Sequence, residues 1–237
     1  MIRAIFFDLD GTLLPMDEKK FEYIYVSTLC KHLIPYGYDP KLVAKGLMDG
    51  MVAMFKNDGR VNNDVAFWNV FNQLLEKDCR EDSQYFDEYY KTGFYETKVA
   101  YGINPYAKEI VEFCKKNFEH VLLTTNPLFP AVATQTRIRC AGLEPDDFDF
   151  VTSFENFMFC KPNPKYFLTL LKMYNLKPEE VLVIGNNTVE DCECALACGI
   201  KSFLIKGQII YDPRAKHEFE EVESKDVIEK IKSFLNE

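Results

Sequence analysis

The sequence lacks any apolar run long enough to span a membrane or to serve as a secretion signal. Its amino-terminal segment, MIRAIFFDLDG, has only five apolar residues between Arg3 and Asp10. A spanning helix needs roughly 20 such residues, and the core of a signal peptide needs about 7 to 15. No repeat or low-complexity segment is evident either. We therefore expect a soluble, cytoplasmic protein that has no membrane partner.

Positive charge is scarce. Lys and Arg total 28 against 37 for Asp and Glu, which gives a formal net charge of -9. Such a balance disfavours nucleic acid and other polyanions as partners. A single small phosphate ester is not excluded, because salt confines surface fields to roughly 10 Å.

The eight cysteines are dispersed through apolar segments, the cluster Cys192, Cys194 and Cys198 lacks both CxxC spacing and a nearby histidine, and the chain has only three histidines. These absences disfavour a zinc site and a disulfide framework. We expect reduced thiols, and we interpret Cys192, Cys194 and Cys198 as small buried residues of one helix. None of the scattered histidines is a convincing catalytic candidate.

Short apolar runs recur along the chain and alternate with helical stretches. These runs, each typical of a strand buried on both faces, are Ile2–Phe7, His120–Thr125, Phe148–Thr152, Val181–Gly185 and Lys201–Ile205. The alternation predicts an α/β fold with a Rossmann-like, three-layer parallel sheet. The acidic run Glu218–Glu223 is interpreted as solvated surface before a final helix.

A long stretch without strand signals interrupts this alternation between residues 16 and 103. Its expected helices are Asp17–Ile34, Pro40–Lys56, Asn63–Lys77 and Asp82–Gly93. We therefore predict an inserted helical-bundle cap domain over 16–103 and a core domain formed by 1–15 plus 104–237. A further helix, Asn104–Asn117, with Pro105 in its first turn, is expected to return the chain to the core.

Two carboxylates stand at the end of the first predicted strand, in Asp8-Leu9-Asp10-Gly11-Thr12. Open α/β sheets place their ligand crevice at the carboxyl ends of strands, and residues two apart in extended chain project to the same side. Two acids that share one site are costly unless a cation compensates them. The pair therefore predicts a bound divalent metal, a nearby lysine, or both. The structural alternative is a strand that ends in an Asp-Gly turn.

The pentapeptide DLDGT resembles the first motif of the haloacid dehalogenase superfamily, and three later segments resemble its other motifs in order. Thr125-Asn126 is similar to the second, and Lys161-Pro162, where the lysine opens a helix, to the third. Gly185-Asn186-Asn187-Thr188-Val189-Glu190-Asp191 is similar to the fourth. Each motif is weak alone, but four in order, each at a predicted strand end or helix start, form a strong signal.

The resemblance implies an enzyme that removes phosphate from a small phosphorylated metabolite. Asp8 would attack phosphorus to form an aspartyl-phosphate, and Asp10 would act as general acid and base. Thr125, Asn126 and Lys161 would hold the phosphoryl oxygens. Dehalogenases of the family lack a second aspartate at this place, so Asp10 favours phosphoryl transfer over carbon–halogen cleavage.

The sequence departs from the family pattern at Asn186, where the family has an acidic residue that ligates Mg²⁺. The implied metal set is Asp8, Asp10, Asn186 and Asp191. Because Mg²⁺ prefers anionic oxygen ligands, Asn186 is expected to weaken its binding. Two alternatives stay open: a non-catalytic or weakly active protein that binds a phosphate ligand, and a phosphomutase on the same scaffold. The sequence does not determine the oligomeric state.

Overall fold

The computed structural model describes residues 1–235 and contains a six-stranded parallel sheet in the order β3-β2-β1-β4-β5-β6. The strands are β1 Ala4–Phe7, β2 His120–Leu123, β3 Phe150–Val151, β4 Val181–Gly185, β5 Lys201–Ile205 and β6 Glu221–Val222. Every neighbouring pair is parallel, and the central strand β1 aligns Phe7 with Leu123 of β2 and with Ile184 of β4. The predicted Rossmann-like parallel sheet is confirmed.

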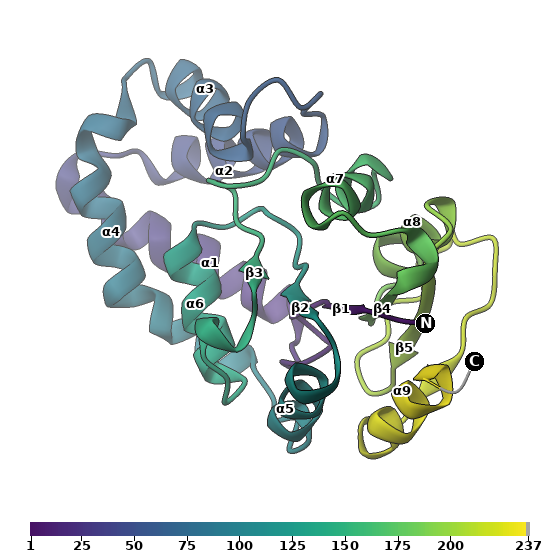
Figure 1. Ribbon diagram of the computed structural model, residues 1–237. Coiled ribbons are helices and arrows are strands. Elements are labelled where there is room, and N and C mark those ends of the chain that lie inside the picture. Colours follow the sequence, from purple (N-terminus) through teal and green to yellow (C-terminus); the bar gives the residue numbers. More distant parts are fainter. Residues whose placement is uncertain (236–237) are drawn as a thin grey trace.

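Alternate residues of each strand point to opposite faces of the sheet, and both faces are buried. Ile5 and Phe7 belong to the cluster that includes residues of α5 and α9, whereas Ala4 and Phe6 belong to the cluster that includes residues of α7 and α8. Figure 1 shows helices on both sides of the strands. The helices around the sheet are α5 Ala107–Asn117, α6 Ala131–Cys140, α7 Lys165–Tyr174, α8 Cys194–Ala197 and α9 Val227–Leu235.

Three local expectations need correction. Helix α5 begins at Ala107, not at residue 104, because the Asn104 side chain accepts the Tyr106 N–H at 3.1 Å and holds a turn ahead of the helix. Lys161 does not open a helix, since α7 starts four residues later, at Lys165. The acidic run 218–223 contains an edge strand, β6, whose Val222 is buried against the core.

Between β1 and α5 the chain forms a helical segment. Its helices are α1 Glu18–Leu33, α2 Pro40–Phe55, α3 Asn63–Leu75 and α4 Ser83–Lys91. Aspartates set two of the starts: Asp17 accepts the Lys20 N–H, and Asp39 accepts those of Lys41 and Leu42 ahead of Pro40. In Figure 1 these helices lie together on one side of the sheet.

The chain enters and leaves this helical segment at a single place. The Gly102 N–H donates to the Pro15 carbonyl at 2.7 Å, and the Asp17 N–H donates to the Ala100 carbonyl at 2.9 Å. Met16 and Tyr101 form an antiparallel bridge between these two hydrogen bonds. Both connections to the sheet therefore lie side by side.

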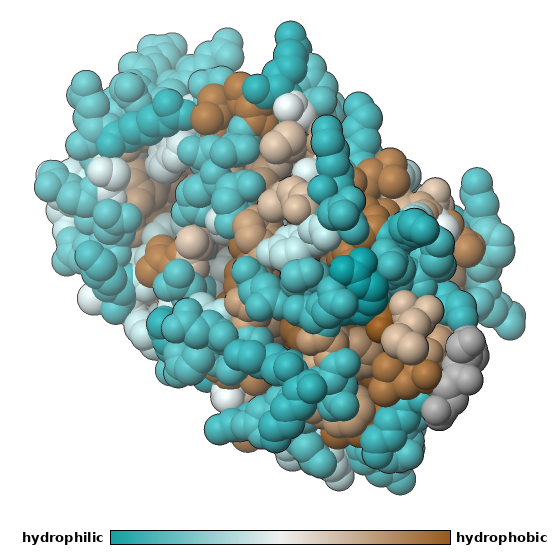
Figure 2. Space-filling view, viewed as in Figure 1, coloured by the Kyte–Doolittle hydropathy of each residue, from teal (hydrophilic) through white to brown (hydrophobic). Residues whose placement is uncertain are grey.

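Short helical turns complete the described chain. They are η1 Ile34–Tyr36, η2 Cys79–Asp82, η3 Gly93–Ala100, η4 Pro145–Asp147, η5 Pro178–Glu180, the π-helical η6 Thr188–Glu193, and η7 Ser224–Asp226. Hydrophilic residues cover most of the face seen in Figure 2, with hydrophobic residues in smaller patches between them. Within residues 1–235, no helix combines the length and apolar character needed to cross a bilayer.

Candidate active site

Asp8 lies at the carboxyl end of β1, where the backbone turns sharply into the following loop. The turn uses Gly11 at φ +83°, a conformation that glycine adopts without a steric penalty. It brings the Thr12 hydroxyl back to donate to Asp8 Oδ2 at 3.2 Å. The buried strand thus presents one carboxylate, already oriented, at the sheet edge.

Lys161 joins two of the predicted acids. Its ammonium lies 2.8 Å from Asp8 Oδ1 and 2.6 Å from Asp191 Oδ1, and the side chain is only 1 % exposed. Burial alone lowers the pKa of Lys161, but Asp191 and Asp8 outweigh it and hold the pKa well above its ordinary value. Burial raises the pKa of Asp8, and the ion pair with Lys161 opposes that rise. The lysine is therefore a permanent cation at the end of β1.

Asp191 is held by hydrogen bonds to both of its carboxylate oxygens. Oδ1 faces Lys161, while Oδ2 accepts the N–H groups of Asn186 at 3.0 Å and Asn187 at 2.9 Å. The loop approaches so closely that a Cβ placed on Gly185 would lie 2.2 Å from Asp191 Oδ2. Asp191 therefore fixes the loop after β4 and positions the lysine.

Asn186 follows β4 and lies across from Asp8. Its Nδ2 donates to the Gln208 carbonyl at 2.8 Å, which fixes the orientation of the amide. Its Oδ1 then faces the Thr12 hydroxyl at 3.4 Å, the same hydroxyl that contacts Asp8. An uncharged oxygen thus stands where the family pattern has a carboxylate.

The residues that end β2 complete this side of the site. Asn126 is fixed at both ends of its amide, since Oδ1 accepts the Lys161 N–H at 2.9 Å and Nδ2 donates to Glu190 Oε2 at 2.7 Å. Thr125 is buried, and its carbonyl accepts hydrogen bonds from the Thr152 and Tyr166 hydroxyls. Both residues line the same pocket as Asp8 and Lys161.

Asp10 has a partner that the sequence analysis did not identify, Arg137 of α6. The guanidinium pairs with Asp10 Oδ2, and the Arg137 side chain is 2 % exposed. Burial raises the pKa of Asp10, and Arg137 opposes that rise. Asp10 Oδ1 and Arg137 Nε are buried without a hydrogen-bond partner in the described chain. The sequence offers only an arginine that follows the second motif by about ten residues, and charged residues at such positions are common on the solvated faces of helices.

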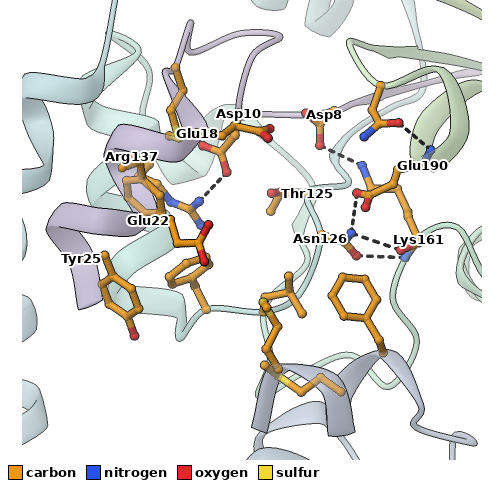
Figure 3. A pocket seen from close by; sticks show the side chains of 18 of the residues that line it. Asp8, Asp10, Glu18, Glu22, Tyr25, Thr125, Asn126, Arg137, Lys161 and Glu190 are labelled. Atoms are coloured by element: carbon orange, nitrogen blue, oxygen red, sulfur yellow. Dashed lines mark hydrogen bonds and ion pairs between the residues drawn. The ribbon is translucent and has the colours of Figure 1, made fainter. Parts of the chain in front are cut away.

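All seven predicted site residues, Asp8, Asp10, Thr125, Asn126, Lys161, Asn186 and Asp191, line one pocket of about 290 Å³. Its other wall comes from α1 and α2 of the helical segment. Figure 3 shows Arg137, Glu18, Glu22 and Tyr25 on one side, and Asn126, Lys161 and Glu190 on the other, with Asp8 and Asp10 between them. The volume lies at the lower end of the roughly 300–1,000 Å³ of typical ligand pockets. The pocket therefore suits a small ligand.

The charges of the pocket are unbalanced. Six carboxylates line it, those of Asp8, Asp10, Glu18, Glu22, Glu190 and Asp191, against the two cations Arg137 and Lys161. Partial burial raises the pKa of Glu18 to about 7, with a further contribution from Asp10, although much of this side chain stays exposed. A dianionic ligand would meet net repulsion here unless a cation accompanied it.

Comparison with known proteins identifies the family. The family model described as haloacid dehalogenase-like hydrolase matches residues 2–199. The chain belongs to this hydrolase family. The matched range includes Asp8, Thr125, Lys161 and Gly185, and the expectation of a haloacid dehalogenase-like enzyme is confirmed.

Individual relatives of this haloacid dehalogenase-like hydrolase include a phosphatase. The glyceraldehyde 3-phosphate phosphatase of Pyrococcus furiosus is 26% identical over 218 residues, which cover 86% of this chain and 81% of the relative. Two solved structures share the fold over nearly their whole length. The 2-haloacid dehalogenase of Pseudomonas syringae pv. Tomato is 20% identical with a TM-score of 0.65, covering 99% of this chain and 100% of its own. A phosphatase of Thermococcus onnurineus is 18% identical with a TM-score of 0.58, covering 97% and 98%.

Proposed function

We propose that this hydrolase removes phosphate from a small phosphate monoester in a Mg²⁺-dependent reaction, with Asp8 as nucleophile. The observation that carries the proposal is the position of the Lys161 ammonium, 2.8 Å from Asp8 and in one pocket with Thr125 and Asn126. A cation beside a carboxylate at the end of a parallel strand suits phosphoryl transfer, which depends on positioning and charge stabilisation. The phosphatase from Pyrococcus furiosus supports this choice over dehalogenation.

The chemistry divides into two displacements on one phosphoryl group. An Asp8 oxygen attacks phosphorus while the ester P–O bond breaks, and Asp10 gives its proton to the departing alcohol. Water then attacks the phosphorus of the aspartyl-phosphate, loses a proton to Asp10, and releases inorganic phosphate and free Asp8. The Lys161 ammonium, the Thr125 hydroxyl and the backbone N–H of Asn126 hold the phosphoryl oxygens throughout.

The residues of the site fit a magnesium ion, although their donor set is mixed. No group of three or more His, Cys, Asp or Glu side chains within 1–235 is arranged to hold a metal. Carboxylate, amide and main-chain oxygens are nevertheless all ligands for Mg²⁺, and the Thr12 hydroxyl brings Asp8 and Asn186 oxygens together. We assign the Asp8 carboxylate, the Asn186 side-chain oxygen and the Asp10 carbonyl as ligands, with Asp191 holding the loop. The ion would supply the positive charge that six carboxylates and a dianionic phosphate require.

We assign the helical segment 16–103 the role of a cap, and residues 1–15 with 104–237 that of the catalytic core. Support comes from the pocket, whose walls combine α1 and α2 with the carboxyl ends of β1, β2 and β4. Closing such a site excludes water and strengthens each charge interaction inside it.

The test is phosphate release from a panel of small phosphate monoesters with Mg²⁺ and with EDTA. We expect release only with Mg²⁺, and a loss of roughly a thousandfold or more in Asp8→Asn. Asp146→Asn, an exposed carboxylate outside the pocket, is the matched control. Absence of release from every ester, together with no beryllium fluoride adduct at Asp8, contradicts the proposal.

Asn186 favours a second candidate, a protein that binds a phosphate ligand with little turnover. The amide gives the metal site one negative charge fewer than the family pattern. If Asn186→Asp alone confers hydrolysis on a silent protein, this candidate replaces the first. A phosphomutase is separated from both by its products, an isomerised phosphate ester without stoichiometric inorganic phosphate.

A further inference from the structure

The wall of the pocket that faces the catalytic groups is apolar and rich in methionine. Helix α2 contributes Met48, Met51, Met54 and Phe55, and the sheet side adds Leu128 and Ile210. In Figure 3, sulfur-containing side chains lie across the pocket from Asp8 and Thr125. This wall belongs to the same cavity as the nucleophile, so a phosphate held by Lys161 would direct the rest of its ester toward it.

The orientation of this wall is built into α2. A Cβ on Gly50 would lie 2.4 Å from the Phe67 ring, and one on Gly46 would lie 2.8 Å from the Phe71 ring, so this face of α2 packs closely against α3. Met48, Met51 and Phe55 are spaced three and four residues apart and therefore share the opposite face. Because the glycine face of α2 packs against α3, the side chains of the opposite face line the cavity.

This wall is accessible and adaptable. Met48 is 43 % exposed and Phe55 is 38 % exposed, whereas buried core side chains of the same helix, such as Val43, are fully covered. Methionine has three rotatable bonds and a polarisable sulfur, which suit it to contact with varied apolar ligands. Hydroxyl groups placed against it would lose water without gaining hydrogen bonds.

The polar groups near this wall also restrict the charge of the ligand. Neither Glu18 nor Glu22 forms an ion pair with any residue of the described chain, and both line the cavity. The Tyr25 hydroxyl is already hydrogen-bonded to that of Tyr90 at 3.0 Å. A second negative charge on the ester would therefore meet the carboxylates of Glu18 and Glu22, whereas Arg137, on the same side of the pocket, is already paired with Asp10.

We infer that the alcohol released by this enzyme is apolar and carries no negative charge: an alkyl or arylalkyl phosphate is preferred over a sugar phosphate or a phosphorylated acid. The inference rests on the proposed phosphatase function and adds the substrate class. It draws on the apolar wall of α2, independently of which residue is the nucleophile.

The test compares kcat/KM for 2-phenylethyl phosphate, glucose 6-phosphate and 2-phosphoglycolate with Mg²⁺. The first two are both esters of primary alcohols, so their ratio reports mainly the contacts with the leaving group. We expect 2-phenylethyl phosphate to exceed glucose 6-phosphate by about tenfold or more, and 2-phosphoglycolate to be the poorest. Met51→Gln is expected to lower the first ratio by roughly fivefold, and Met48→Gln to lower it as well.

Met173→Gln, a 51 % exposed methionine of α7 outside the pocket, is the matched control and is expected to leave the ratio unchanged. Equal or better use of glucose 6-phosphate or 2-phosphoglycolate overturns the inference, as does an unchanged ratio in both Met51→Gln and Met48→Gln. If no ester is hydrolysed, the proposed function fails. Calorimetry with the matching phosphonates then decides the inference, because tighter binding of the phenylalkyl phosphonate supports it and equal binding overturns it.

Discussion

Arg137 reaches from α6 into the catalytic pocket and pairs with Asp10, with its guanidinium centred 4.6 Å above the Phe129 ring. The pair is shielded on one side by this ring and by Phe21 of α1, which lies 5.7 Å away. A carboxylate proposed to donate and accept a proton is thus held by a cation that is itself buried. We propose that Arg137 is a positioning residue for Asp10, and its contact with Phe21 also joins α6 to the helical segment.

Removing Arg137 leaves the half-buried Asp10 carboxylate without its partner. We expect Arg137→Met to lower the free energy of unfolding by roughly 3–5 kcal/mol, because breaking one side of a buried ion pair is strongly destabilising. Adding Asp10→Asn to that variant should recover about 1–3 kcal/mol, since the uncompensated charge is gone. Urea unfolding of both single variants and the double variant measures the coupling. Additive changes would show that the two residues do not depend on each other.

Asn186→Asp places a carboxylate beside Asp8, at a position that we propose as a Mg²⁺ ligand. We expect the Mg²⁺ concentration for half-maximal hydrolysis to fall by roughly tenfold, because an anionic oxygen replaces a neutral one. Without Mg²⁺ the same change should lower the thermal midpoint, since it adds a carboxylate to a pocket with six already. Mg²⁺ titrations of activity and of thermal unfolding measure both effects. An unchanged half-saturation would remove Asn186 from the ligand set.

Gly11 and Gly37 form a matched pair for testing the turn after β1. Both have similar positive φ angles, +83° and +85°, so alanine costs each roughly 1 kcal/mol through backbone conformation. A Cβ on Gly11 would also lie 2.0 Å from the Asn186 amide, whereas nothing lies within 4 Å at Gly37. We expect Gly11→Ala to lose hydrolysis and Gly37→Ala to retain it. Equal activity in the two variants would show that Asn186 moves aside without consequence.

The cysteines provide a test that is independent of catalysis. Burial raises the pKa values of Cys114, Cys160 and Cys192 to about 12, so at pH 8 these thiols stay protonated and unreactive. Among the eight, Cys140 is partly exposed and the other seven are buried. Ellman's reagent should therefore modify one thiol rapidly in the native protein and all eight in denaturant. Cys140→Ser should abolish the rapid phase, and two or more rapid thiols would contradict the packing.

Buried strands and their ends could be predicted from the sequence because they carry local signals. Val181–Gly185 and Lys201–Ile205 are observed with the predicted bounds, since short segments rich in apolar residues between polar turns mark where a buried strand begins and ends. The convergence of Asp8, Lys161 and Asp191 followed from the parallel sheet, which places all strand ends at one edge.

Features that depend on tertiary contacts could not be predicted in this way. Nothing in the sequence around Arg137 indicates its partner, and only the fold brings its guanidinium to Asp10. Strand β6 has two residues and one buried side chain, Val222, too short a segment for an alternation to be recognised. The turn at Asn104 is likewise closed by the Asn104 side chain, which accepts the Tyr106 N–H. The proline at position 105 instead indicated the first turn of a helix.

The two hydrogen-bonded pairs Pro15–Gly102 and Asp17–Ala100 hold together the two chain segments that connect the helical segment to the sheet. A different helical insert, of another length or composition, could be grafted at those two adjacent points without disturbing any strand. If the proposed phosphatase function holds, selection on the insert would alter which alcohols are accepted, while selection on the sheet preserves the reaction itself.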